Sequence, residues 1–237
     1  MRNGELMEFV FDVDGTLTPS RGKIDPEFKQ FFDEFCLKNN VYFVTGSDKD
    51  KTVEQLGEDT YALAKVVFNC SGNDIYTTGV NVRKNEWTLP DQLRKMLEGW
   101  LQGSNFKYRT GNHIEERPGT VNFSIVGRNC TLDERKEYIK YDKLMRERES
   151  IAFQINHSFK EITATVGGET GIDIYPTGCD KGQVYYEFSK GATIHFFGDK
   201  MEPGGNDYPL AKLLKHPSKA IQVDNWQHTW KLLKEYD

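Results

Sequence analysis

The chain has 237 residues, of which 37% are hydrophobic, and this is enough for one large domain or two modest ones. Its 31 basic and 36 acidic residues give a net charge of −5, which argues against broad nucleic-acid binding. The N-terminal stretch is too short and too charged for a signal peptide, and no segment has the length of a membrane span. Four scattered cysteines without metal-binding spacing favour reduced thiols. We therefore expect a soluble cytoplasmic protein with no nucleic-acid or membrane partner.

The first eighty residues alternate predicted strands with predicted helices. Short apolar runs predict strands at residues 8–13, 41–45 and 66–68. Residues 25–38 are expected to be helical, because phenylalanines recur there at spacings of three and four. A second helix is predicted with Ser47 as its N-cap and Gly57 at its end. This alternation is typical of a parallel sheet with crossover helices.

The pattern changes near Gly79. Val121, Phe123 and Ile125 alternate with polar residues, as in a strand with one wet face. Thr131 and Glu134 form a capping-box pattern that predicts a charged helix through about Glu149. Two further strands, 162–166 and 172–175, flank a Gly-Gly turn. Apolar runs typical of a parallel sheet then predict strands at 193–197 and 221–223. The sequence thus predicts an α+β domain on an antiparallel sheet, residues 80–180, inserted into an α/β domain formed by residues 1–79 and 181–237.

Two aspartates stand at the end of the first predicted strand, in the stretch "FVFDVDGTLTPS". Asp12 and Asp14 are two residues apart on an extended segment, so their side chains point the same way. In a parallel α/β sheet the carboxyl ends of the strands form the ligand-binding edge. Two close carboxylates repel each other unless a cation or a shared proton intervenes, and Mg²⁺ prefers oxygen ligands. The pair therefore indicates a site for a divalent cation.

Other polar groups are expected at the same edge of the sheet. Thr45 and Ser47 lie beside a predicted helix N-terminus, which suits a phosphate group. Lys181 precedes the strand at 193–197, and Asp199 and Asp207 follow that strand in "FFGDKMEPGGND". A carboxylate nucleophile, a hydroxyl, a lysine and distal carboxylates are together suited to phosphoryl transfer through an aspartyl-phosphate.

The motifs "DVDGT", "VTGS", Lys181 and "GDKMEPGGND", in this order, resemble those of the haloacid-dehalogenase superfamily. The resemblance implies a Rossmann-like parallel-sheet core with the inserted domain as an α+β cap. It implies Asp12 as the nucleophile, Asp14 as the general acid and base, and Thr45 or Ser47 with Lys181 as phosphate ligands. Mg²⁺ would be held by a set of aspartates: Asp12, Asp14 through its backbone carbonyl, Asp199, and Asp207 in support.

Three arginines of the inserted segment suggest a second anion site. Arg128 lies just before the helix predicted to start at Thr131, and Arg135 lies one turn inside it. Both can approach a helix N-terminus, where an anion is favoured, and guanidinium groups match phosphate oxygens. Arg117, in "HIEERPGTVNFS", is the third. A solvated helix face is the alternative interpretation of these charges, and the residues alone leave it open.

Nearly the whole chain, from "FDVDGTLTPSRGKI" through "VGRNCTLDER" and "GIDIYPTGCDK" to "FFGDKMEPGGND", resembles the eukaryotic-type phosphomannomutases. The resemblance implies interconversion of mannose 6-phosphate and mannose 1-phosphate through a hexose 1,6-bisphosphate, which also serves as activator, with glucose phosphates as further substrates. It implies that the substrate is contacted by residues from both domains: Arg21, Arg117, Asn122, Arg128, Arg135 and Asp173. A homodimer through the cap is also expected.

Some positions depart from the family pattern, and two other functions remain open. Gly171 stands where the family has a serine two residues before the sugar-binding aspartate, and "NCSGN" follows Phe68 in place of "PENG". The segment "NHIEE" replaces a more apolar stretch used in dimer contacts. One alternative is a Mg²⁺-dependent sugar-phosphate phosphatase of the same superfamily. The other is a non-catalytic sugar-phosphate-binding protein, which would not need a nucleophile.

Overall fold

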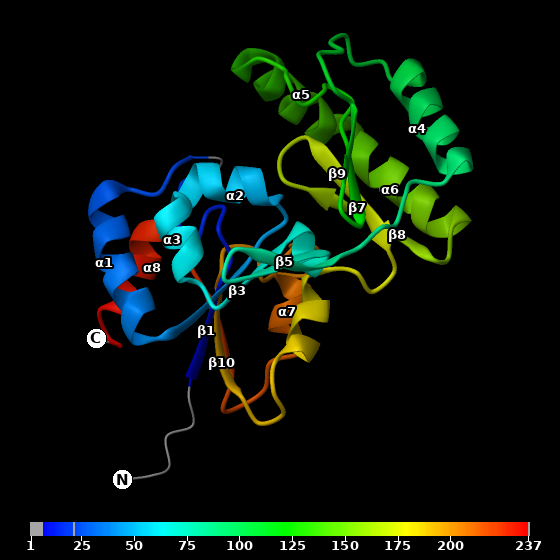
Figure 1. Cartoon of the computed structure of the whole chain (residues 1–237). Coiled ribbons are helices and arrows are strands. Elements are labelled where there is room, and N and C mark those ends of the chain that lie inside the picture. The colour runs from blue at the N-terminus through cyan, green and yellow to red at the C-terminus, as the bar shows by residue number, and fades with distance from the viewer. Residues whose placement is uncertain (1–6, 21, 237) are drawn as a thin grey trace. The chain divides into compact units, whose positions relative to one another are not determined.

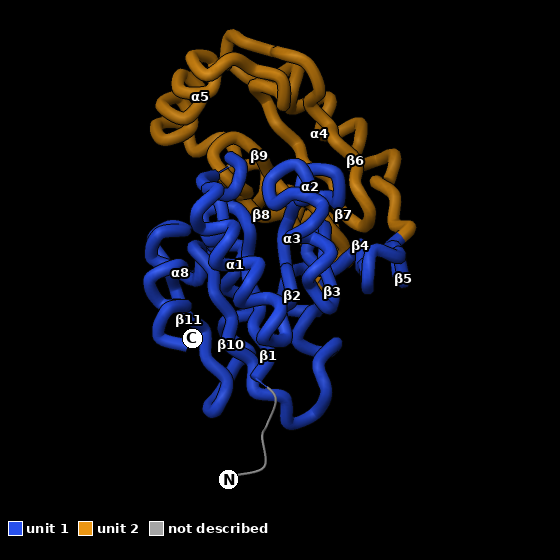
Figure 2. Tube along the Cα trace, turned by 60° about the vertical axis from the view of Figure 1, so that its left-hand side comes forward, with its two compact units in different colours: residues 1–85, 179–237 blue, residues 86–178 orange. Residues whose placement is uncertain are grey.

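The computed structural model describes residues 7–20 and 22–236 (Figure 1). The chain forms two compact units, one made of residues 1–85 and 179–237 and the other of residues 86–178 (Figure 2). We call them unit 1 and unit 2. The single contiguous segment of unit 2 interrupts unit 1 in the sequence, so unit 1 is built from both ends of the chain.

Unit 1 contains a seven-stranded sheet in the order β11-β10-β1-β2-β3-β4-β5. Its strands are β1 (Met7–Phe11), β2 (Asn40–Val44), β3 (Val66–Asn69), β4 (Asp74–Thr77), β5 (Val80–Lys84), β10 (Thr193–Gly198) and β11 (Lys219–Gln222). Five strands, from β11 to β3, run parallel, and the hairpin β4–β5 is added antiparallel at one end. The parallel α/β core predicted from the sequence is therefore confirmed.

Helices cover both faces of this sheet. Because alternate side chains of a strand point to opposite faces, Phe9 and Phe11 pack on one side and Val10 on the other. The first side carries α1 (Pro26–Lys38), α2 (Lys49–Leu56), α3 (Glu58–Leu63) and α8 (Trp226–Leu233). The second carries the 3₁₀ segment η2 (Lys181–Glu187) and α7 (Tyr208–Ala211). A 3₁₀ turn, η1 (Cys70–Gly72), follows β3.

The start of α2 differs from the prediction. Its N-cap is Asp48, whose side chain accepts a hydrogen bond from the backbone N–H of Lys51, so the prediction of Ser47 was wrong. Both residues are good N-caps, and sequence preference does not separate them. The backbone N–H of Ser47 instead donates to Thr45 Oγ1, which shapes the turn between β2 and α2.

Unit 2 contains an antiparallel sheet of four strands in the order β6-β7-β9-β8. They are β6 (Ile114–Arg117), β7 (Thr120–Phe123), β8 (Ile162–Gly167) and β9 (Gly171–Pro176). One face packs on the helices α4 (Asp91–Gly103), α5 (Leu132–Met145) and α6 (Glu147–Ser158) through a separate apolar core. The antiparallel sheet was predicted, whereas α4 was not.

The charged helix predicted through about Glu149 is in fact two helices. The capping box of Thr131 and Glu134 is present at the start of α5. The helix ends before Arg146, which adopts the left-handed conformation with φ 52°. The buried carboxylate of Asp142 accepts hydrogen bonds from the backbone N–H and Nε of Arg148, and this contact across the break stabilises it. Among the described residues, no helix has both the length and the apolar character needed to cross a lipid bilayer.

Candidate active site

The carboxyl ends of the parallel strands in unit 1 bring together residues far apart in the sequence. Asp12 directly follows β1, and its backbone N–H donates to the carbonyl of Phe197 in β10 at 2.9 Å. Lys181 Nζ, at the start of η2, donates to Asp12 Oδ1 at 2.5 Å and to Asp207 Oδ1 at 2.7 Å. All three side chains are buried. The structure therefore joins the predicted nucleophile, lysine and distal carboxylate in one ion-paired group.

Burial and charge shift the pKa values of this group. The pKa of Asp12 is raised, first by burial and then by the neighbouring charge of Asp207. Burial alone would lower the pKa of Lys181, but the carboxylates of Asp12 and Asp207 outweigh it and raise that pKa, so the lysine stays charged. The site thus has more negative charge than its lysine neutralises.

Asp199, at the end of β10, completes a cluster of carboxylates. Asp12, Asp199 and Asp207 each offer an oxygen within 4.8 Å of the others. Asp199 Oδ1 is buried, and no described residue donates a hydrogen bond to it. Burial is also the main reason why the pKa of Asp199 is raised. A buried oxygen lacking a donor within a set of oxygen ligands fits a hard divalent cation such as Mg²⁺.

Asp14 occupies a different position from this cluster. Gln55 Nε2, from α2, donates to Asp14 Oδ1 at 2.9 Å and fixes the carboxylate. Gly15 follows with φ +84°, and a Cβ at this residue would come within 2.4 Å of Asp199 Oδ2. Only glycine avoids both the strained conformation and this clash, so the "DVDGT" turn can bring Asp14 and Asp199 to the same end of the sheet.

The predicted phosphate ligands lie at the end of the adjacent strand. Phe43 in β2 is paired with Phe11 in β1, so Thr45 follows β2 at the level where Val13 follows β1. Thr45 is buried, and Ser47 is partly exposed beside the start of α2. The structure thus places these hydroxyl-bearing residues on the strand next to the one that carries Asp12.

In unit 2 a row of polar side chains crosses the face of the sheet that the helices leave uncovered. Glu115, Asn122, Asp173 and Thr165 are cross-strand neighbours in successive strands. Asn122 Nδ2 donates to Asp173 Oδ1 at 2.6 Å. Asn122 and Asp173 are therefore brought together, and they can present hydrogen-bonding groups to a polar ligand.

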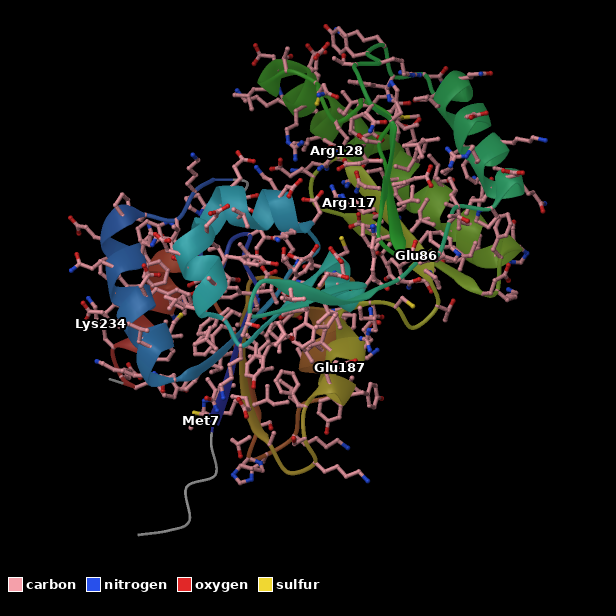
Figure 3. The ribbon with its side chains drawn as sticks, in the orientation of Figure 1. Met7, Glu86, Arg117, Arg128, Glu187 and Lys234 are labelled. Atoms are coloured by element: carbon pink, nitrogen blue, oxygen red, sulfur yellow. The ribbon has the colours of Figure 1, made fainter. Side chains whose placement is uncertain are left out.

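Two different glutamates hold the three arginines of unit 2 that the sequence predicted as an anion site. Glu115 accepts hydrogen bonds from Nε and Nη2 of Arg117 and forms an ion pair with Arg128 Nε at 2.6 Å. Both arginines lie on one side of the smaller sheet (Figure 3). Arg135 is instead paired with Glu169. Arg21, predicted to contact substrate, lies outside the described residues.

Gly171, which departs from the family pattern, has a close neighbour. A Cβ at this position would lie 2.6 Å from Asn122 Nδ2. A serine here would therefore force Asn122 to move. The side chain of Asn122 occupies the space that the missing hydroxyl would need.

Several residues of these sites had escaped prediction: Thr16, Gln55, Glu115 and Arg148. Thr16 Oγ1 donates to Asp12 Oδ2 at 3.3 Å, and its position inside the "DVDGT" motif was a usable signal. Glu115 lies two residues before Arg117 in β6, so the alternation of side chains along a strand could have placed them on one face. No sequence signal connects Gln55 with Asp14, because the contact spans 41 residues.

Comparisons with known proteins agree with this geometry. A family model described as eukaryotic phosphomannomutase matches residues 28–235. A probable phosphomannomutase of Caenorhabditis elegans is 32% identical over 96% of this chain and 96% of its own length. Phosphomannomutase 1 of Homo sapiens is 35% identical over 88% of this chain and 84% of its own length. A haloacid dehalogenase-like hydrolase from Bacteroides thetaiotaomicron has the same fold, with a TM-score of 0.61 at 13% identity over 98% of this chain and 100% of that one.

Proposed function

The chain belongs to the eukaryotic phosphomannomutase family, and on this premise we propose that it interconverts mannose 6-phosphate and mannose 1-phosphate. It is an enzyme of the intramolecular phosphotransferase type. The observation that carries the proposal is the buried group of Asp12, Lys181 and Asp207 at the carboxyl ends of β1 and β10. A protein that only binds sugar phosphates has no need of a buried nucleophile.

Asp12 would be the nucleophile. One of its oxygens attacks phosphorus while the bond from phosphorus to the sugar oxygen breaks, so the phosphoryl group passes to the carboxylate. Lys181 keeps Asp12 in place and neutralises the charge that gathers on the phosphoryl oxygens. Thr45 and Ser47 would donate further hydrogen bonds to these oxygens.

Asp14 would be the general acid and base. It gives a proton to the departing sugar oxygen and later takes one from the hydroxyl that receives the phosphoryl group. Gln55 holds this carboxylate in one orientation. The backbone carbonyl of Asp14, together with Asp12, Asp199 and Asp207, would hold Mg²⁺. When bound, Mg²⁺ offsets the negative charge of the carboxylates and of the phosphoryl oxygens.

Unit 2 would select the substrate and act as the cap. The polar groups of unit 2 match a hexose phosphate: Asn122 and Asp173 for hydroxyl groups, and Arg117, Arg128 and Arg135 for the phosphate that is not reacting. Arg21 is proposed as a further substrate contact. A hexose 1,6-bisphosphate would be both intermediate and activator, and glucose phosphates would be further substrates.

The remaining proposals concern assembly and location. We place the enzyme in the cytoplasm, in keeping with the reduced thiols of Cys36, Cys130 and Cys179. A homodimer through unit 2 is proposed from the family resemblance.

Phosphorus NMR tests the function in one tube. Mannose 1-phosphate is incubated with the enzyme, Mg²⁺ and a catalytic amount of glucose 1,6-bisphosphate. The expected result is the appearance of mannose 6-phosphate with total ester phosphate conserved. Release of inorganic phosphate alone would identify a phosphatase, and an unchanged spectrum would identify a binding protein.

A further inference from the structure

We propose that Glu169 is a built-in competitor of the substrate phosphate at Arg135. Its carboxylate holds the guanidinium while the site is empty and leaves when a sugar phosphate binds, so Glu169 weakens phosphate affinity. The inference rests on the proposed function, because that function assigns the non-reacting phosphate to the arginines of unit 2.

Arg135 and Glu169 form a close ion pair in which the two side chains differ in their exposure to solvent. Arg135 Nε donates to Glu169 Oε2 at 2.6 Å, and Nη1 donates to Thr170 Oγ1 at 3.3 Å. The Arg135 side chain is only 13% exposed, whereas the Glu169 side chain is 60% exposed. The guanidinium is therefore held in one place, while water can readily solvate the carboxylate of Glu169 once the ion pair is broken. Of the two partners, the carboxylate is the one that loses less burial when the pair separates.

The turn that carries Glu169 is anchored by other contacts. Arg148 Nη1 donates to the carbonyls of Gly168 and Gly171, each at 3.2 Å, and to that of Gly167 at 3.4 Å. Ser124 Oγ donates to the carbonyl of Thr170 at 3.1 Å. Because Arg148 and Ser124 hold the backbone between β8 and β9, the Glu169 side chain can change its rotamer without unfolding the turn.

The other glutamate of this surface is a poorer candidate for exchange. Glu115 binds two arginines, Arg117 and Arg128, and its side chain is only 26% exposed. Releasing it would break several hydrogen bonds at once. A phosphate can add to Arg117 and Arg128 while Glu115 stays. On Arg135 the Nε–H is already taken by Glu169, so a phosphate that binds through this donor displaces the carboxylate.

Calorimetric titration of mannose 6-phosphate into the full-length protein tests the competition. A chelator is present, so that phosphate binding does not depend on a cation in unit 1. The proteins compared are wild type, Glu169→Gln, Arg135→Ala and the double variant. Glu116→Gln is the matched control, because it removes one negative charge from β6, at the other edge of the same sheet, and breaks the ion pair with Arg94 instead.

An ion pair with an exposed partner contributes little free energy, so its removal should raise the affinity for mannose 6-phosphate by a small but measurable factor. Glu169→Gln should bind about two- to five-fold more tightly than wild type. Arg135→Ala should bind more weakly, and adding Glu169→Gln to it should change nothing, because the shared donor is gone. Glu116→Gln should match wild type. In the isomerisation assay, Glu169→Gln should lower KM for mannose 1-phosphate.

Three results would overturn the proposal: unchanged or weaker binding by Glu169→Gln, an equal gain in the Arg135→Ala background, or an equal gain from Glu116→Gln. The last two would show that only net charge matters. Failure of the proposed function is seen separately in the phosphorus NMR experiment. If isomerisation is absent but the binding gain depends on Arg135, Glu169 still competes with phosphate.

Discussion

At the scale of single residues, the proposed function depends on charged side chains that folding removes from water. Lys181 lies between Asp12 and Asp207, with 2.5 and 2.7 Å separating Nζ from their oxygens. Removing one partner from such a buried group leaves an uncompensated charge, at a cost of about 3–5 kcal/mol. Replacing any one of these three residues is therefore expected to lower both the activity and the stability of the protein.

Asp12→Asn should abolish isomerisation while the protein stays folded. The amide keeps the shape of the side chain, but it cannot accept the phosphoryl group and is a poor ligand for Mg²⁺. Turnover is measured by phosphorus NMR and folding by circular dichroism. Asp224→Asn, at a carboxylate that is 87% exposed in the same unit, is the control and should be fully active. A near-normal rate in Asp12→Asn would rule out the aspartyl-phosphate.

His195 should make stability depend on pH. Its pKa is lowered from 6.5 by burial and by the nearby charge of Lys219, while its Nδ1 lies 2.9 Å from the hydroxyl of Tyr236. The folded state favours the neutral ring, so below about pH 6.5 the unfolded state binds the proton first. The free energy of unfolding should therefore fall as pH drops from 6.5 toward the lowered pKa.

The measurement is the urea midpoint at pH 7.5 and at pH 5.5. Wild type should lose more stability between these two values than His195→Gln, which cannot titrate. His157→Gln, at an exposed histidine, should behave as wild type does. Equal losses in wild type and His195→Gln would show that this histidine has no part in the effect.

At the scale of elements, the ends of helices decide where functional side chains lie. The capping box places Arg135 one turn inside α5, because Thr131 Oγ1 accepts from the N–H of Glu134 while Glu134 accepts from the N–H of Thr131. Glu134 also accepts a hydrogen bond from Thr110, which ties the helix start to the segment between α4 and β6. The position of Arg135, which is proposed to bind phosphate, thus depends on this cap.

Thr131→Ala should lower the stability of the protein by about 1 kcal/mol, because the side-chain acceptor of the cap is lost. The change is measured as a shift of the urea midpoint with the slope unchanged. Thr131→Ser keeps the hydroxyl and should retain most of the wild-type stability. If alanine and serine variants were equally stable, the hydrogen bond of the cap would contribute nothing.

At the scale of the whole molecule, the residues proposed for the chemistry and the described residues proposed for substrate selection belong to different units. The carboxylates and lysine all belong to unit 1, and the described arginines proposed to bind substrate belong to unit 2. Each unit has its own apolar core. Unit 2 is contiguous in sequence, whereas the central strands β1 and β10 of unit 1 come from opposite ends of the chain.

Residues 86–178 should fold when expressed alone, because their core does not draw on unit 1. Residues 1–85 alone should not, since β1 would lack its partner β10. Thermal melting followed by circular dichroism separates the two cases: the first fragment should melt cooperatively and the second should not. A disordered 86–178 fragment would mean that unit 2 depends on unit 1 for stability.

Patterns that act over a few residues were sufficient to predict much of this protein. The "DVDGT" turn, the helix with Phe28, Phe32 and Phe35 in the core, and the Thr131 capping box follow from spacing and local hydrogen bonding, and all three are present. The parallel core and the antiparallel insertion follow from the change in apolar periodicity. Such features depend on neighbours within one or two turns of the chain, so the sequence displays them directly.

Contacts between distant segments were decided only by the tertiary structure. Lys181 reaches Asp12 across 169 residues, and Gln55 reaches Asp14 across 41. Sequence preference also did not separate Asp48 from Ser47 as N-cap, and it did not show the break at Arg146, where the carboxylate of Asp142 is buried as it binds Arg148. The pairing of Arg135 with Glu169 likewise exists only once α5 and the β8–β9 turn are folded together. Spacing along a chain cannot show these partners, because the free energy that selects them comes from burial, which exists only in the folded state.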